Sequence, residues 1–330
     1  AITGTFINRN FLRGAELFQW QLHTSYEIQA NARQAGPVFA FEAGTEASLT
    51  LPRLVTPVRV RYGSLRFMPQ TTMKLGVLLQ NRVGFFQINS FNASYGYLWR
   101  ETQQKNHAFY PVDLIYLQRR RLSPEFLARL AVDPFLNRST ENQAILGSRY
   151  SYTYNSQTGE QPRNRQRNNL YFNGNIDLSG NLAFLFQRLA GSEGGTFDRP
   201  FEVFGQPYSQ YARADVDLRF YRQLTKRQQL ATRLIVGAGY AYGNAFTMPY
   251  VKQFAAGGSN SVRAFRARSL GPGSYDAFND VDVRAFIDQT GDLKLESSVE
   301  YRFDIVGFLK GAAFVDAGNV WLLRGDTTRP

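Results

Sequence analysis

Residues 211–221 read YARADVDLRFY, and this stretch decides the fold. Its side chains alternate, so that one face is apolar and the other is charged or polar. The apolar face comprises Ala212, Ala214, Val216, Leu218 and Phe220. The polar face comprises Arg213, Asp215, Asp217, Arg219 and Tyr221. Strict alternation predicts a β-strand whose two faces meet different environments.

Alternation of the same kind covers 39–51, 73–82 and 170–184. Further segments raise the expected number of strands to about twelve. These segments are 1–10, 13–31, 86–103, 105–120, 142–156, 228–243, 292–305 and 309–321. A strand of a soluble protein typically has about 5–6 residues, whereas a tilted strand that crosses a membrane needs roughly 9–11. The predicted strands meet the longer requirement.

The charges on the polar faces separate two all-β architectures. A large soluble barrel or sandwich would expose its polar face to bulk water and bury the other in a small core. A membrane barrel turns its apolar face to lipid and its charged face to a wet lumen. Aromatic residues make up 15% of the chain, and strands favour them. Strand length, charge and aromatic content together favour an all-β fold, an antiparallel transmembrane β-barrel.

The composition limits the classes of function that the chain can have. The 330 residues have a formal net charge of +12, which indicates an anionic partner such as nucleic acid, lipid headgroups or lipopolysaccharide. The chain has 0 cysteines and 2 histidines, so thiolate or histidine-rich metal sites and disulfides are excluded. Asp215 and Asp217 could do acid–base chemistry, but a charge ladder in a wet lumen explains them better. We therefore expect no metal site and no enzyme activity.

The stretch 255–276 reads AAGGSNSVRAFRARSLGPGSYD and contains Arg263, Arg266 and Arg268. It could be a phosphate-binding loop, a nucleic-acid loop or a loop anchored inside its own barrel. The patterns G-x-x-x-x-G-K-S/T and G-x-G-x-x-G do not occur in it. Nucleic-acid binding needs a basic face with interleaved aromatics, whereas the arginines of this chain lie beside aspartate and glutamate. In an anchored loop, Arg266 and Arg268 would hold the loop to the wall or contact lipopolysaccharide.

Three segments in order resemble the superfamily of outer-membrane assembly and translocation barrels that includes BamA and TamA. Val262-Arg263-Ala264-Phe265 is similar to the Val-Arg-Gly-Phe/Tyr motif of the family's sixth extracellular loop. The family has a glutamate on the next strand, as in 291–303, and then Phe-x-Asp-x-Gly, as in 314–318. Ala264 replaces the usual glycine, and this variant with the Arg-Ser-Leu-Gly-Pro-Gly that follows resembles the TamA-like TamL proteins of Bacteroidetes.

The resemblance implies a sixteen-stranded barrel, of which 1–330 would cover about strands two to thirteen. It implies upstream POTRA repeats and closing strands outside this chain. The implied function is insertion or translocation of other proteins at the bacterial outer membrane, through a lateral seam and without a cofactor. The implied partners are outer-membrane lipid and lipopolysaccharide, client outer-membrane or secreted proteins, and an inner-membrane or periplasmic assembly partner. A secretion pore of the same superfamily and a passive porin-like channel are the alternatives.

The family's loop lies in the lumen with its arginine on the wall, and the predicted pleat can be tested for suitable partners. Alternation over 291–303 and 312–318 places the candidate partners on single strand faces. These residues are Glu296, Glu300, Phe314, Asp316 and Gly318. The contrasting interpretation is that Arg263 is a solvated loop charge and that the acidic residues are ordinary lumen side chains.

We expect Arg263 to pair with Asp316 and with either Glu300 or Glu296, because its planar group can bind carboxylates at two points. We also expect Val262 or Phe265 to pack near Phe314. Gly318 would leave room for the loop backbone.

The connections between strands are expected to differ on the two sides of the membrane. A short turn such as 224–226 would lie on the periplasmic side. The long connections 190–208 and 244–279 would lie outside the cell. A helical turn is expected within 123–131, where a serine cap precedes a proline.

Overall fold

The computed structural model describes residues 2–29, 38–57, 67–82, 86–124, 127, 141–158, 167–275 and 289–324. Within these residues, twelve strands form one antiparallel sheet in which each strand pairs with the next strand of that sheet along the chain. They are β1 (Ile2–Asn8), β2 (Leu17–Gln29), β3 (Val38–Leu51), β4 (Gln70–Arg82), β5 (Phe86–Arg100), β6 (Lys105–Arg120), β7 (Gln143–Asn155), β8 (Asn168–Ser179), β11 (Tyr211–Thr225), β12 (Gln228–Ala241), β13 (Leu293–Val306) and β14 (Leu309–Trp321). The predicted all-β antiparallel fold is confirmed.

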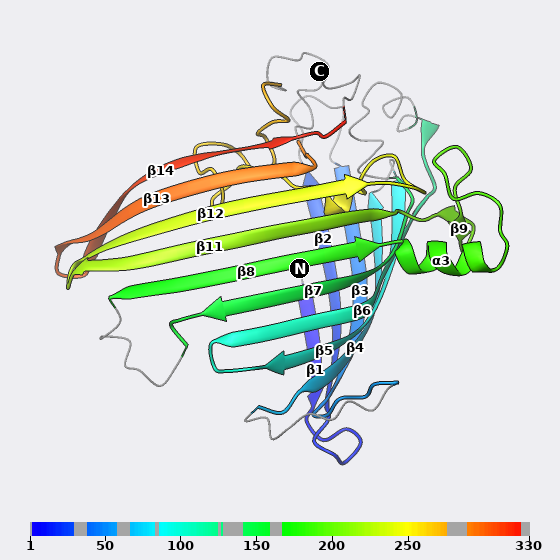
Figure 1. The fold of residues 1–330 in the computed structure, drawn as a ribbon, viewed down its shortest axis with the longest axis horizontal. Helices are drawn as coiled ribbons and strands as arrows, with labels where there is room; N and C mark the ends of the chain where they lie inside the picture. Colours follow the sequence, from blue (N-terminus) through cyan, green and yellow to red (C-terminus); the bar gives the residue numbers. More distant parts are fainter. Residues whose placement is uncertain are drawn as a thin grey trace.

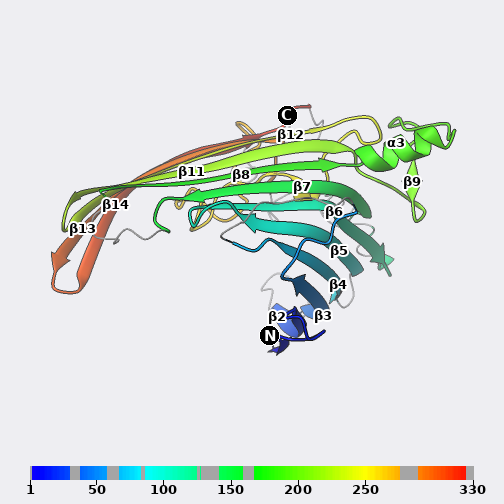
Figure 2. The ribbon, with the colours of Figure 1, turned by 60° about the horizontal axis from the view of Figure 1, so that its bottom comes forward.

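The sheet curls around an interior. Figure 1 shows β1 to β3 behind β11 to β14, and Figure 2 shows the curve closer to edge-on. The strands of this sheet after β1 are long, from 12 residues in β8 to 16 in β6. These lengths match a membrane-crossing strand rather than a strand of a soluble protein. No helix within the described ranges has the length and apolar character needed to cross a membrane.

The two faces of the sheet differ as the alternation predicts. Large apolar side chains are exposed on the outer face, and they include Leu75, Val77, Leu79, Val216, Leu234, Val236, Leu295 and Val299. Ion pairs lie on the inner face, such as those of Asp217 with Arg219 and Arg233. An apolar exterior around a charged interior is the arrangement of a membrane barrel.

The strand expected over 170–184 is wrong in its last part. Strand β8 ends at Ser179, and α3 (Asn181–Leu189) follows. Gly180 has a φ of 78°, in the left-handed region, where glycine is favoured. This residue turns the chain out of the strand. Within the expected loop 190–208, β9 (Glu202–Val203) and β10 (Gln206–Pro207) form a short hairpin.

The connection between β12 and β13 passes back against the sheet. We call residues 242–275 of this connection the inserted loop; it contains the 3-10 helix η2 (Tyr250–Lys252). Met248 packs against Ile145, Tyr211 and Ala241 of the sheet. Short turns join β11 to β12 and β13 to β14. The helical turn expected within 123–131 lies mostly outside the described residues.

Candidate functional site

The inserted loop is held against the inner face of β12, β13 and β14. Phe254 and Ala256 form a buried cluster with Val320 of β14. Phe254 also exchanges backbone hydrogen bonds of 2.8 and 2.9 Å with Gly291. In Figure 2 the loop, coloured yellow to orange, lies on the concave side of the sheet. These contacts bring the loop's arginines within reach of the strand carboxylates.

Arg263 contacts two strands at once. Its Nε and Nη2 atoms each donate a hydrogen bond of 2.8 Å to Asp316 on β14. Its Nη1 atom donates to Glu300 on β13. The backbone N–H of Arg263 donates a further bond of 3.1 Å to Asp316. Hydrogen bonds to Asp316 and Glu300 raise the pKa of the Arg263 guanidinium above its usual range, so the group stays charged.

An aromatic ring completes the surroundings of Arg263. The guanidinium carbon lies 3.4 Å from the centroid of the Phe314 ring, which is a cation–π contact. Ser298 donates a bond of 2.7 Å to Asp316 and so supports the carboxylate from the side. The Asp316 side chain is 5% exposed, which strengthens its pairing with Arg263 relative to a pair in bulk water.

The two candidate glutamates differ in what they contact. Glu300 binds Arg263 and also lies 2.5 Å from Nε of Arg302. Glu296 lies 3.0 Å from Nζ of Lys294 and accepts a hydrogen bond from the Ser261 hydroxyl. Alternation could not separate these glutamates, because both point inward from the same strand. The structure places Glu300 beside Arg263 and Glu296 beside Lys294 and Ser261.

The remaining motif residues are divided between buried and exposed positions. Val262 is buried, and its Cγ2 would lie 3.0 Å from a Cβ added at Gly318. Gly318 therefore leaves the room that the loop requires. Ala264 is exposed and Phe265 is 45% exposed. We expected Val262 or Phe265 to pack near Phe314, and the contact that the structure shows on that ring is the guanidinium of Arg263.

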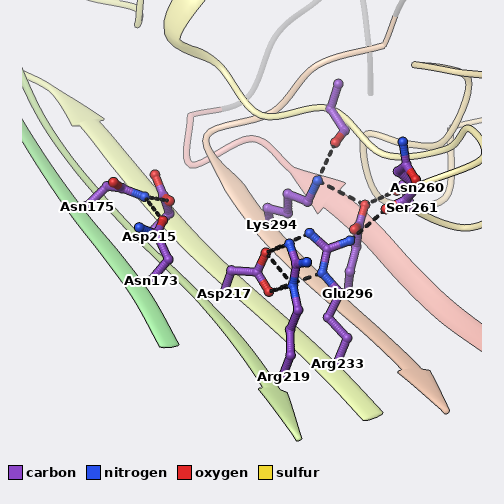
Figure 3. A network of polar contacts seen from close by, with 11 residues as sticks. Asn173, Asn175, Asp215, Asp217, Arg219, Arg233, Asn260, Ser261, Lys294 and Glu296 are labelled. Carbon is purple, nitrogen blue, oxygen red and sulfur yellow. Dashed lines mark hydrogen bonds and ion pairs between the residues drawn. The ribbon is translucent and has the colours of Figure 1, made fainter. Parts of the chain in front are cut away.

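Cations on the wall bind carbonyl groups of the inserted loop, as Figure 3 shows in part. Arg233 donates a bond of 2.7 Å to the carbonyl of Asn260 and also pairs with Asp217. Lys294 donates a bond of 2.8 Å to the carbonyl of Ala255. These bonds satisfy backbone groups that a loop inside a barrel would otherwise leave unpaired.

A second ion pair holds the start of the inserted loop. Nζ of Lys252 lies 2.6 Å from Asp177 on β8, and the Asp177 side chain is 5% exposed. Nearby, Arg213 pairs with Asp215 at 2.7 Å and lies over the Phe254 ring at 4.2 Å. Sequence reasoning missed Lys252, because no periodic pattern links a loop lysine to a strand 75 residues earlier.

The other two arginines of the motif region differ from Arg263. Arg268 lies over the Tyr250 ring, with its guanidinium carbon 4.8 Å from the centroid. Arg266 is exposed. The aspartates considered for catalysis are both ion-paired, Asp215 with Arg213 and Asp217 with Arg219 and Arg233. Their contacts are those of a charge ladder along the inner face.

The curled antiparallel sheet with an apolar exterior and a charged interior is that of an outer-membrane β-barrel. The family model described as "Omp85 superfamily domain" matches residues 17–329, and the chain belongs to this superfamily. The protein is therefore located in the outer membrane of Gram-negative bacteria, as predicted.

Individual relatives cover less of the molecule. The chain is 30% identical over 117 residues to the outer membrane protein assembly factor BamA of Neisseria meningitidis serogroup B, a match that covers 34% of this chain and 14% of BamA. The structure of BamA from Haemophilus ducreyi lacking POTRA domains 1-3 matches with a TM-score of 0.57 and 12% identity, over 97% of this chain and 57% of that one. CdiB from Escherichia coli matches with a TM-score of 0.46 and 11% identity, over 98% of this chain and 49% of that one. The chain therefore spans less than two thirds of the length of these relatives.

Proposed function

We propose that this chain forms the membrane barrel of a factor that inserts or translocates other proteins at the outer membrane. The observation that carries the proposal is the contact of Arg263 with Asp316 and Glu300, which fixes the inserted loop to the inner wall. Similarity to an assembly factor of the same superfamily supports it.

The mechanism that we propose uses the barrel wall rather than a chemical step. A lateral seam between the first and last strands of the complete barrel opens, and a client strand pairs with the exposed edge. The anchored loop stabilises the neighbouring wall strands β12 to β14 while the seam moves. Clients would be outer-membrane or secreted proteins, and no cofactor is required.

We also propose which branch of the superfamily this chain belongs to. The Val-Arg-Ala-Phe sequence of 262–265 supports a TamL-like member with upstream POTRA repeats. Such a member would work with an inner-membrane or periplasmic partner and would contact lipopolysaccharide. A full-length sequence with several POTRA repeats would agree with an assembly role. A dedicated secreted partner encoded nearby would instead indicate a secretion pore.

Assembly of a client by the protein in liposomes tests the proposal. An unfolded outer-membrane client is added, and its folded fraction is followed by heat-modifiable gel mobility. We expect Arg263→Ala to slow client folding well below the wild-type rate, because the loop loses its charged contact with both strands. Arg266→Ala is the matched control, since it removes an exposed arginine from the same loop.

Two results would contradict the proposal. Wild-type protein that does not accelerate client folding over empty liposomes would rule out the assembly function. Equal acceleration by Arg263→Ala and Arg266→Ala, with both variants folded, would rule out a role of the anchored loop in it.

A further inference from the structure

Helix α3 turns its apolar face away from the protein. Leu182, Leu185, Phe186 and Leu189 are exposed, and Phe186 and Leu189 are 69% and 76% exposed. Their spacing places them on one stripe of the helix. Asn181, Ala183, Phe184 and Gln187 on the other side are partly buried. A helix on a water-exposed surface would have the opposite orientation, so α3 requires an apolar environment outside the barrel.

The segment that contains α3 lies over the outer face of the sheet. Asp113 and Ile115 of β6 line an interior cavity together with Arg149. Tyr116 lies between Ile115 and Leu117, which both line this cavity, and therefore points outward. Phe204, at the tip of the β9–β10 hairpin, packs edge-on against Tyr116, with ring centroids 6.1 Å apart. The hairpin next to α3 is thus on the lipid side of the wall.

A small outer cluster joins α3 to the same surface. Ala144 of β7 forms a buried cluster with Phe201 and Tyr208, and Phe184 of α3 packs against it. The Phe184 and Phe201 ring centroids are 5.7 Å apart. Because Phe184 faces the barrel, the stripe on the opposite side of α3 faces away from it.

Polar contacts fix the rotation of α3. Asn181 accepts hydrogen bonds from Gln210 at 3.1 Å and from the Tyr242 hydroxyl at 2.8 Å. The Gln187 amide donates a bond of 2.9 Å to the carbonyl of Glu202. The apolar stripe could therefore turn inward only if these bonds broke.

The stripe continues the lipid-facing surface of the barrel. Ile176 and Leu178 of β8 are exposed on the outer face immediately before α3 begins. Figure 1 shows α3 extending beyond the end of β8. A tilted strand needs roughly 9–11 residues to cross the hydrocarbon, so the end of the 12-residue β8 lies near the boundary between hydrocarbon and headgroups. Arg188 is exposed beside the stripe and can extend toward lipid phosphates.

We propose that α3 is an interfacial lipid anchor. Its stripe of Leu182, Leu185, Phe186 and Leu189 lies in the boundary between hydrocarbon and headgroups, in the leaflet at the end of the barrel where β8 ends. The bound partner is the lipid surface itself, because the helix is continuous with strands whose outer face already contacts lipid. This role is independent of the proposed function of the inserted loop.

Site-specific fluorescence quenching tests the anchor. The chain has 0 cysteines, so Phe186→Cys and Glu193→Cys can each be labelled with bimane in the intact protein, reconstituted in phosphatidylcholine bilayers. Glu193 is the matched control, since it is exposed and polar and lies shortly after the helix. Lipids brominated near the headgroup should remove most of the emission at position 186 and little at position 193. Aqueous iodide should do the reverse.

Each other outcome overturns the proposal. Equal iodide quenching at both positions would place α3 in water. Protection of position 186 from both quenchers would show that another copy of the protein covers the stripe. Heat-modifiable mobility verifies that both labelled variants are folded, and Leu182→Cys provides a second position on the stripe if Phe186→Cys is not.

Discussion

Arg263 combines three interactions in one side chain. Its guanidinium binds Asp316 and Glu300, and its plane lies over the Phe314 ring. A lysine at this position keeps the charge but cannot bind two carboxylates with a planar group. We expect Arg263→Lys to weaken the anchor by about 1–2 kcal/mol, which opens the inserted loop roughly 5–30-fold more often. Cleavage by an arginine-specific protease after Arg268, which packs over the Tyr250 ring in the anchored loop, reports that opening.

Arg302→Lys is the control for this prediction. Arg302 also pairs with Glu300, but its side chain is about half exposed and lies outside the inserted loop. A surface pair contributes about 0–1 kcal/mol, so this variant should leave the cleavage rate nearly unchanged. If Arg263→Lys and Arg302→Lys were cleaved alike, the bidentate geometry of Arg263 would not hold the loop.

The partners of Arg263 could be named from the sequence because each lies on a strand. The strand pleat fixes which side chains share a face, so Asp316 and both glutamates follow from alternation. The choice of Glu300 over Glu296 depends on the position of the loop along β13, which alternation does not define. Lys252 and its pairing with Asp177 depend on the loop path alone.

Gly180 determines where β8 ends and α3 begins. Its φ is 78°, and a Cβ there would lie 2.8 Å from the carbonyl oxygen of Ser209. Gly191 has a similar φ of 79° but no atom within 4 Å of an added Cβ. We expect Gly191→Ala to cost about 1–2 kcal/mol from backbone strain alone. Gly180→Ala should cost more, because the backbone around Ser209 must also move.

Urea unfolding of the two alanine variants in lipid bilayers measures this difference. The midpoint should fall further for Gly180→Ala than for Gly191→Ala. An equal fall would mean that the Ser209 backbone yields without cost, and that positive φ alone sets the requirement for glycine at position 180.

The strand predicted over 170–184 was wrong in its last part for a physical reason that belongs to the scale of the secondary-structure element. Leu182 and Phe184 continue the alternation of β8, so a period of two extends through them. The stripe of α3 also fits a helical period, and the two patterns overlap. Gly180 was the available signal, since an isolated glycine inside a strand pattern often marks a change of direction.

At the scale of the whole molecule, the strands could be predicted from the sequence, whereas the position of the inserted loop inside the barrel could be predicted only in part. The long strands of the described sheet follow from local alternation, because each strand meets lipid on one side and charge on the other. The inserted loop has no such period. Its position results from separate contacts with β8, β12, β13 and β14, and the sequence identified only the pair of strands that carries the motif partners.

The inserted loop crosses the interior between two anchors, Lys252 on Asp177 of β8 and Arg263 on the β13–β14 wall. A loop held at both ends obstructs ion flow, so wild-type channels in planar bilayers should have low conductance. Removing both charged contacts in Lys252→Met/Arg263→Ala should raise the single-channel conductance and add fluctuations, because the loop can leave the path. Each single variant should have a smaller effect, since the other anchor remains.

A control variant must show whether the rise in conductance comes from the loss of two positive charges or from release of the inserted loop. Lys226→Met/Arg266→Ala removes the same two charges from an exposed turn and an exposed loop position, so it should conduct like wild type. Conductance of the folded Lys252→Met/Arg263→Ala protein equal to that of this control would show that the loop does not limit the path. A wild-type conductance as high as that of an open pore would favour the porin-like alternative, because such a channel needs an unobstructed lumen.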